Sequence, residues 1–182
     1  MYALLASVTL IGSLHIADTT ISFGVVRRDL TGDGIPETLT LMGTGPTLDR
    51  LQVTFSVQSS GQTIFSNSWP FTRPVDGSPK PGSDAALRSR LEEYGPWFFA
   101  DSKFMSPSAF LTELQRSARL HIDEIPNVIN REVGDSARAR ILWEHMRAST
   151  IIIFEFSRGG DAITAIGWSA TDKRFYHLFE CC

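Results

Sequence analysis

The segment Leu51-Gln-Val-Thr-Phe-Ser-Val57 alternates apolar and polar residues at every position. A period of two places successive side chains on opposite faces of a strand, so one face meets a core and the other meets water. Shorter alternating runs lie on either side of it, at residues 21–25, 38–41 and 63–69. The first third of the chain therefore predicts four antiparallel strands joined by short turns.

The middle of the chain, residues 84–148, carries helical signals instead. Apolar residues recur there at a spacing of three to four, which is the period of an amphipathic helix. Capping residues, prolines and glycines mark where these helices should begin and end. The signals are Ser83 or Asp84 as N-cap, Gly95-Pro96 as a stop, Ser106-Pro107 as a start, Pro126 as a break and Gly134-Asp135 as a further start.

The last third returns to strands. Residues 151–156 form a run that is apolar on both faces, as in a central strand, and residues 163–167 and 175–179 predict two more strands. Strands, helices and strands in separate blocks predict an α+β fold. We expect one antiparallel sheet of about seven strands from both chain ends, with the helical insertion at 84–148 packed on one face.

The chain has 182 residues, which predicts a single domain over 1–182. Residues 70–83 are rich in proline and glycine and predict a connecting loop. A net charge of −3 without a basic run argues against nucleic-acid binding. We therefore expect another protein as partner, and the sequence gives no support for membrane contact.

Both ends of the chain leave alternatives open. Residues 1–17 have the apolar core of an export signal but no basic region before it, so they predict either such a signal or a first strand. We expect a periplasmic or secreted protein, with a cytoplasmic one as the alternative. The adjacent Cys181 and Cys182 are compatible with an intermolecular disulfide, although two idle thiols at the end of a strand are the simpler expectation.

One stretch indicates a specific chemistry: Asp29-Leu-Thr-Gly-Asp-Gly-Ile-Pro-Glu37. Oxygen-bearing side chains fall at Asp29, Thr31, Asp33 and Glu37. A short loop with this spacing can curl around a hard cation such as Ca²⁺, which takes six to eight oxygens at about 2.3–2.6 Å. Because the loop joins two predicted strands, it should form the tip of a hairpin.

This stretch resembles the calcium loop of the FG-GAP and VCBS repeats, which occur in integrin-like propellers and in many exported bacterial proteins. The resemblance implies side-chain ligands at Asp29, Thr31, Asp33 and Glu37, a carbonyl ligand at Ile35, and a structural Ca²⁺. Thr31 departs from the usual asparagine or aspartate. A single copy covering about twenty residues implies no propeller.

The loop has two other interpretations. An EF-hand would require a glutamate at the twelfth position, where this chain has Thr40. A turn without metal would also use aspartate and glycine, because Asp29 and Asp33 can bond the loop backbone and glycine tolerates positive φ. The EF-hand is the poorer match, while the bare turn stays open beside the calcium loop.

The weak candidates for an active site are Glu155, Asp161 and His177. A carboxylate on a central strand is costly unless it is paired, and Arg158 or Arg174 could neutralise Glu155 in a structural salt bridge. No motif of a known catalytic class supports the three residues. A hydrolase using a carboxylate–histidine pair is therefore the alternative function rather than the first.

The aromatic segment Trp97, Phe98 and Phe99 has two interpretations: a binding patch for a partner, or core packing over a sheet. Taken together, the sequence predicts a non-enzymatic extracytoplasmic accessory or binding subunit of a larger assembly, with a calcium-stabilised hairpin. An inhibitor or immunity-type binding protein is a further alternative, in which the aromatic segment and the loop at 70–83 would contact the target.

Overall fold

The computed structural model describes residues 19–71, 84–117, 124–158 and 162–181. The segments expected as an export signal or first strand (1–17) and as most of the proline-rich loop (72–83) lie outside these residues, as does Asp161. In chain order the elements are β1 (Thr19–Arg28), β2 (Glu37–Gly45), η1 (Leu48–Arg50), β3 (Gln52–Ser59), β4 (Gln62–Pro70), α1 (Asp84–Phe98), η2 (Asp101–Lys103), β5 (Phe104–Met105), α2 (Pro107–Ser117), α3 (Ile125–Val133), α4 (Ser136–Arg147), β6 (Ile153–Ser157), β7 (Ile163–Ser169) and β8 (Arg174–Cys181).

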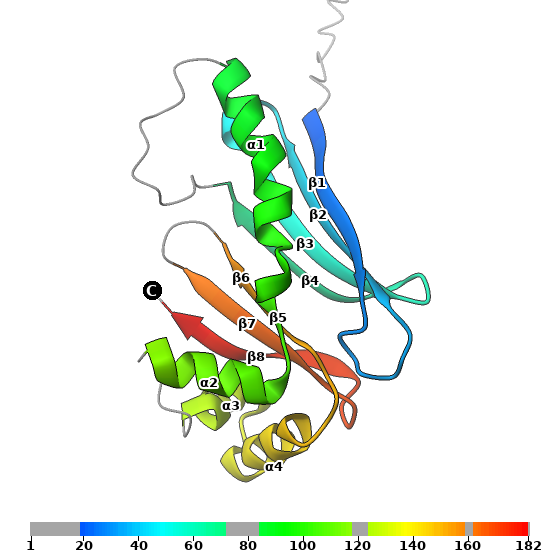
Figure 1. Cartoon of the computed structure of the whole chain (residues 1–182), viewed down its shortest axis with the longest axis vertical. Coiled ribbons are helices and arrows are strands. Elements are labelled where there is room, and N and C mark those ends of the chain that lie inside the picture. Colours follow the sequence, from blue (N-terminus) through cyan, green and yellow to red (C-terminus); the bar gives the residue numbers. More distant parts are fainter. Residues whose placement is uncertain (1–18, 72–83, 118–123, 159–161, 182) are drawn as a thin grey trace, which may run out of the picture.

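The strands form two antiparallel sheets of four (Figure 1). Sheet A has the order β1-β2-β3-β4 and sheet B the order β5-β6-β7-β8. The α+β class is confirmed, but the expectation of a single sheet of about seven strands is wrong. Each sheet is a meander in which neighbours in sequence pair, so the strands from the two ends of the chain never join edge to edge.

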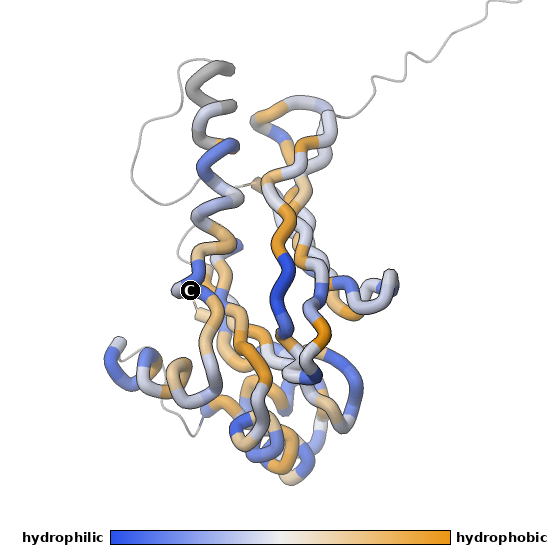
Figure 2. Tube along the Cα trace, turned by 45° about the vertical axis from the view of Figure 1, so that its right-hand side comes forward, coloured by the Kyte–Doolittle hydropathy of each residue, from blue (hydrophilic) through white to orange (hydrophobic). Residues whose placement is uncertain are grey.

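The two sheets instead pack through a layer of aromatic side chains. The ring of Phe55 on β3 lies 5.2 Å from the rings of both Phe154 and Phe156 on β6. Trp69 stacks on Phe156 at 5.9 Å, and Phe98 at the end of α1 lies 5.5 Å from Phe55. Such pairs contribute about 0.5–1.5 kcal/mol each beyond burial. Figure 2 shows hydrophobic residues running along the strands of both sheets.

The opposite face of sheet B is covered by α2, α3 and α4 (Figure 1). Strand β6 is buried at all five positions, as predicted for a central strand, because sheet A and α1 cover one face and these helices cover the other. The helical side chains of this second core are Phe110, Leu114, Ile125, Ile129, Ala139, Leu142, Trp143 and Met146.

Two predicted helix starts are confirmed. The hydroxyl of Ser106 accepts the amide of Ala109 at 3.3 Å, and α2 begins at Pro107. The carboxylate of Asp135 accepts the amides of Ala137 and Arg138, and α4 begins at Ser136. Both side chains satisfy amides that the first turn of a helix leaves without an intrahelical partner.

The predicted helix stop at Gly95-Pro96 is wrong, because α1 continues to Phe98 with Pro96 inside it. The extra turn buries Phe98 and Phe99 in the aromatic layer. Gly95 allows this course, since a Cβ there would lie 1.7 Å from the carbonyl oxygen of Phe23 on β1. In the sequence Gly95 indicates the end of a helix, but in the structure it permits α1 to lie directly against β1.

Gly95→Ala should therefore lower the free energy of unfolding by about 3 kcal/mol or more, at the upper end of overpacking effects, because rigid backbone on β1 cannot yield. Chemical denaturation of the variant measures this loss. Gly61→Ala is the control: its Cβ meets nothing within 4 Å, so only left-handed strain of about 1–2 kcal/mol remains. Equal losses in both variants would contradict the close contact between α1 and β1.

Candidate metal centre

The acidic loop lies between β1 and β2, at the tip of the first hairpin, as predicted. Gly32 and Gly34 adopt φ values of +74° and +86°, which residues with a Cβ rarely adopt. Two glycines at these positions let the chain coil tightly enough to bring its amides onto one carboxylate.

Asp29 organises the coil. One of its carboxylate oxygens, Oδ1, accepts the amides of Gly32 at 2.7 Å and Asp33 at 3.2 Å, and Oδ2 accepts the amide of Gly34 at 2.8 Å. Asp33 in turn accepts the amide of Ile35 at 2.8 Å. These are the backbone bonds that aspartates make in turns, and they occur with or without a cation.

Glu37 closes the loop from the first position of β2. Its side chain is 1% exposed. Oε2 accepts the amides of Leu30 at 2.7 Å and Thr31 at 3.4 Å, while Oε1 accepts the hydroxyl of Thr31 at 3.1 Å. A carboxylate buried this deeply is tolerated only with such partners. Like the bonds of Asp29 and Asp33, these bonds of Glu37 hold the loop with or without a cation.

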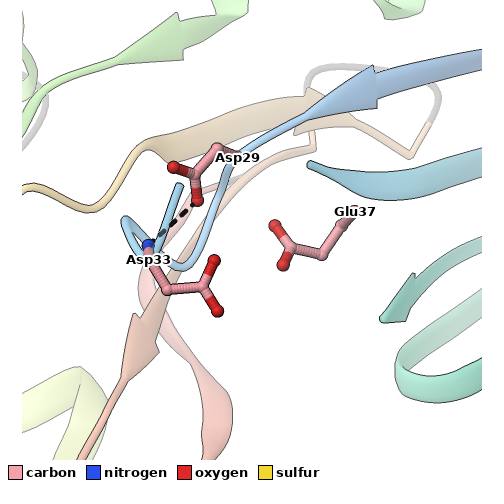
Figure 3. Close-up of side chains that lie close together, drawn as sticks. All are labelled: Asp29, Asp33 and Glu37. Carbon is pink, nitrogen blue, oxygen red and sulfur yellow. Dashed lines mark hydrogen bonds between the residues drawn. The ribbon is translucent and has the colours of Figure 1, made fainter. Parts of the chain in front are cut away.

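The carboxylates of Asp29, Asp33 and Glu37 converge, with ligand oxygens within 4.8 Å of one another (Figure 3). The hydroxyl of Thr31 lies between two of them, 3.1 Å from Glu37 and 3.5 Å from Asp29. In the part of the chain that the structure describes, none of the three carboxylates forms a salt bridge with lysine or arginine. Their mutual repulsion is thus offset by backbone amides of the loop and by the Thr31 hydroxyl.

The donor set fits a hard cation. Three carboxylates and a hydroxyl face a common space. Oδ2 of Asp29, Oδ1 of Asp33 and Oε1 of Glu37 each accept one bond, so each keeps a lone pair for a metal. Ile35, the fifth predicted ligand, would contribute only its carbonyl oxygen, and its side chain is 59% exposed. All of these ligand groups belong to one loop, residues 29–37, so a bound cation would link the two ends of that loop.

The loop also contacts sheet B, which the sequence did not predict. Leu30 is fully buried, and its carbonyl accepts the amide of Ile152 at 3.2 Å. The hydroxyl of Thr150 donates to the carbonyl of Gly32 at 3.1 Å. A candidate metal centre thus lies where the tip of sheet A meets the segment leading into β6. No local sequence signal marks Thr150, 118 residues away.

Gly32→Ala tests this contact. An added Cβ would lie 2.9 Å from the amide nitrogen of Ile151 and 2.8 Å from the hydroxyl of Thr150. Gly34→Ala, in the same loop and at a similar φ, meets nothing within 4 Å and controls for left-handed strain. In chelator, we expect Gly32→Ala to lose about 2 kcal/mol more in the free energy of unfolding than Gly34→Ala. Equal losses of unfolding free energy in Gly32→Ala and Gly34→Ala would contradict a close contact between the loop and the segment at 150–151.

Glu155 and His177 do not meet. Glu155 pairs with Ala165, whose side chain belongs to the core under the helices. His177 pairs with Ile166, which belongs to the aromatic core facing sheet A, and its ring lies 6.0 Å from that of Phe65 on β4. The two side chains therefore point to opposite faces of sheet B and cannot act together on one substrate.

The predicted arginine partners of Glu155 are also wrong. Lys103, in η2, lies 3.4 Å from the Glu155 carboxylate. Arg158 pairs with Glu180, and Arg174 pairs with Glu132. Lys103 immediately precedes β5, and the pairing of β5 with β6 places it beside Glu155. Because β5 has only two residues, sequence periodicity could not predict it.

The three aromatic residues predicted to bind a partner separate into core and surface. Phe98 and Phe99 are 1% and 7% exposed and belong to the aromatic layer, whereas Trp97 is 45% exposed. Trp97 stacks on Tyr94 at 5.8 Å, and the Lys103 ammonium lies 5.7 Å from its ring. Burial raises the pKa of Tyr94 to about 12. Of the three, only Trp97 is exposed to solvent.

At the end of β8, Cys181 is disulfide-bonded, so the expected idle thiol at this position is wrong. The other cysteine of the chain, Cys182, lies outside the described residues.

Among the helices described, none is both long and apolar enough to cross a membrane. No family model matches the chain, and no curated protein or solved structure is significantly similar to it.

Proposed function

We propose that this protein is a calcium-binding, non-enzymatic module that works outside the cytoplasm as an accessory or binding subunit of a larger assembly. The observation that carries the proposal is the convergence of Asp29, Asp33 and Glu37 beside the hydroxyl of Thr31. The calcium would be structural, since the loop fixes the contact between the hairpin tip and the segment at 150–152.

The separation of Glu155 from His177 supports a binding role over the hydrolase alternative. Trp97 supports another protein as partner, because an exposed tryptophan over a packed base is typical of contact surfaces. The charge of the whole chain and the absence of a basic run in its sequence disfavour nucleic acid as that partner.

Calcium titration after chelation tests the metal centre. For a dissociation constant of about 1 mM, typical of extracellular modules, 10 mM Ca²⁺ should raise the free energy of unfolding by about 1.4 kcal/mol. Asp33→Asn should abolish this gain with little effect in chelator, because the amide oxygen can still accept the Ile35 amide. Thermal melting with and without Ca²⁺ measures both quantities.

Asp135→Asn is the matched control: it removes one acidic charge at the N-cap of α4, where asparagine caps equally well. This variant should respond to Ca²⁺ like the parent. No stabilisation of the parent at 10 mM Ca²⁺ would remove the metal centre, and an equal gain in parent and Asp33→Asn would place the ion elsewhere.

The extracytoplasmic location has a separate test. Fractionation of the source cells, followed by intact mass of the purified protein, should find it outside the cytoplasm. Recovery in the cytoplasmic fraction would refute this part of the proposal and leave the calcium centre to be judged by the titration.

A further inference from the structure

A second cluster of charged side chains joins α3 to β8, at the edge of sheet B. One carboxylate oxygen of Glu132 on α3, Oε1, accepts both the backbone amide of His177 and its ring nitrogen Nδ1, each at 2.9 Å. The other oxygen, Oε2, pairs with Arg174. One side chain thus receives three donors from a single strand, two of them ionisable.

This contact occupies a strand edge. β8 is the last strand of sheet B, so the outward amide of His177 has no neighbouring strand to bond. Glu132 satisfies it, while Ile125 and Ile129 of the same helix are buried in the core shared with sheet B. The carboxylate therefore serves both to cover an edge and to fasten a helix.

A second carboxylate fastens α4 in a similar way. Asp172, in the turn between β7 and β8, accepts both contacts of the Arg138 guanidinium at 2.9 Å and the hydroxyl of Tyr176. The Arg174 guanidinium, which binds Glu132, lies 4.5 Å from the ring of Tyr176. Two of the three helices that cover the second core, α3 and α4, are thus attached to sheet B through a carboxylate.

The charges around Glu132 are one-sided. On β8, the charged or ionisable side chains that face Glu132 are Arg174 and His177. Helix α4 also packs against α3, but its Arg138 pairs with Asp172 and not with Glu132. Burial alone would raise the pKa of Glu132, but the hydrogen bonds and charges of His177 and Arg174 lower it from 4.5 overall. The pKa of Asp172 is likewise lowered, chiefly by the Tyr176 hydroxyl. A lowered pKa in the folded state means that each acid stabilises the fold above its ordinary pKa, and that this stability is lost as pH falls through the folded value.

We propose that Glu132 and Asp172 form an acid-sensitive latch that holds α3 and α4 on sheet B at neutral pH and releases them in acid, while sheet A and the aromatic layer remain folded. Sheet A contributes no donor to either acid, although the ring of Phe65 on β4 lies 6.0 Å from that of His177. The core of sheet A lies on the other side of sheet B. Release of α3 and α4 would expose the part of the apolar face of sheet B that these two helices cover.

Hydrogen exchange followed by mass spectrometry tests the latch, with rates corrected for the intrinsic pH dependence. In the parent, protection of α3 should fall as pH drops below 4.5 and that of α4 as pH drops below 3.8, the ordinary pKa values of the two acids, and both should fall before that of β3. Glu132→Gln keeps the shape but removes the charge, so α3 should exchange at least tenfold faster at pH 7, the loss expected for hydrogen bonds to a charged group.

Glu113→Gln is the matched control, since Glu113 pairs with Arg116 on the exposed side of α2. It should leave α3 unchanged. Protection of β3 in Glu132→Gln reports that the variant is folded. Equal exchange of α3 in Glu132→Gln and parent at pH 7, or simultaneous loss of protection in β3 and α3 on acidification, would overturn the latch.

Discussion

The structure depends on the stacking of two sheets through one aromatic layer. Phe55 lies at its centre, in contact with rings from α1 and β6. Aromatic side chains bury large areas with few rotatable bonds, so a single layer can join two four-stranded meanders that share no edge. The continuation of α1 past Gly95-Pro96 follows from the same layer, because the last turn of the helix supplies Phe98.

The candidate metal centre depends on this stacking. Once the sheets face each other, the tip of the first hairpin meets the segment before β6, and Leu30 is buried there. The buried Glu37 holds the amides of Leu30 and Thr31. The acidic loop therefore forms part of the contact between the two sheets, and the proposed cation would stabilise that contact.

The features predicted correctly from the sequence are those set by residues close together in the chain. Period-two alternation located the strands of sheet A, and Ser106 and Asp135 marked two helix starts, because caps act within one turn. It also placed the acidic loop at a hairpin tip. It could not predict the division into two sheets, since alternation shows that a strand has an apolar face but not what covers that face.

Contacts made over long sequence separations escaped prediction for the same reason. Thr150 with Gly32, Lys103 with Glu155 and Glu132 with His177 are each set by tertiary packing, and none has a pattern of its own. Phe98 and Phe99 had two interpretations in sequence, binding patch or core, and burial decides for the core.

The separation of 118 residues between Gly32 and Thr150 also orders the assembly of the molecule. Sheet A is a succession of adjacent hairpins, whose closure costs little chain entropy, and all of it precedes the helices in sequence. During synthesis this meander can form early, but its acidic tip must wait for the segment before β6 to leave the ribosome. Until then the carbonyl of Leu30 lacks the amide of Ile152, and the apolar side of sheet A lacks the rings of Phe154 and Phe156 on β6.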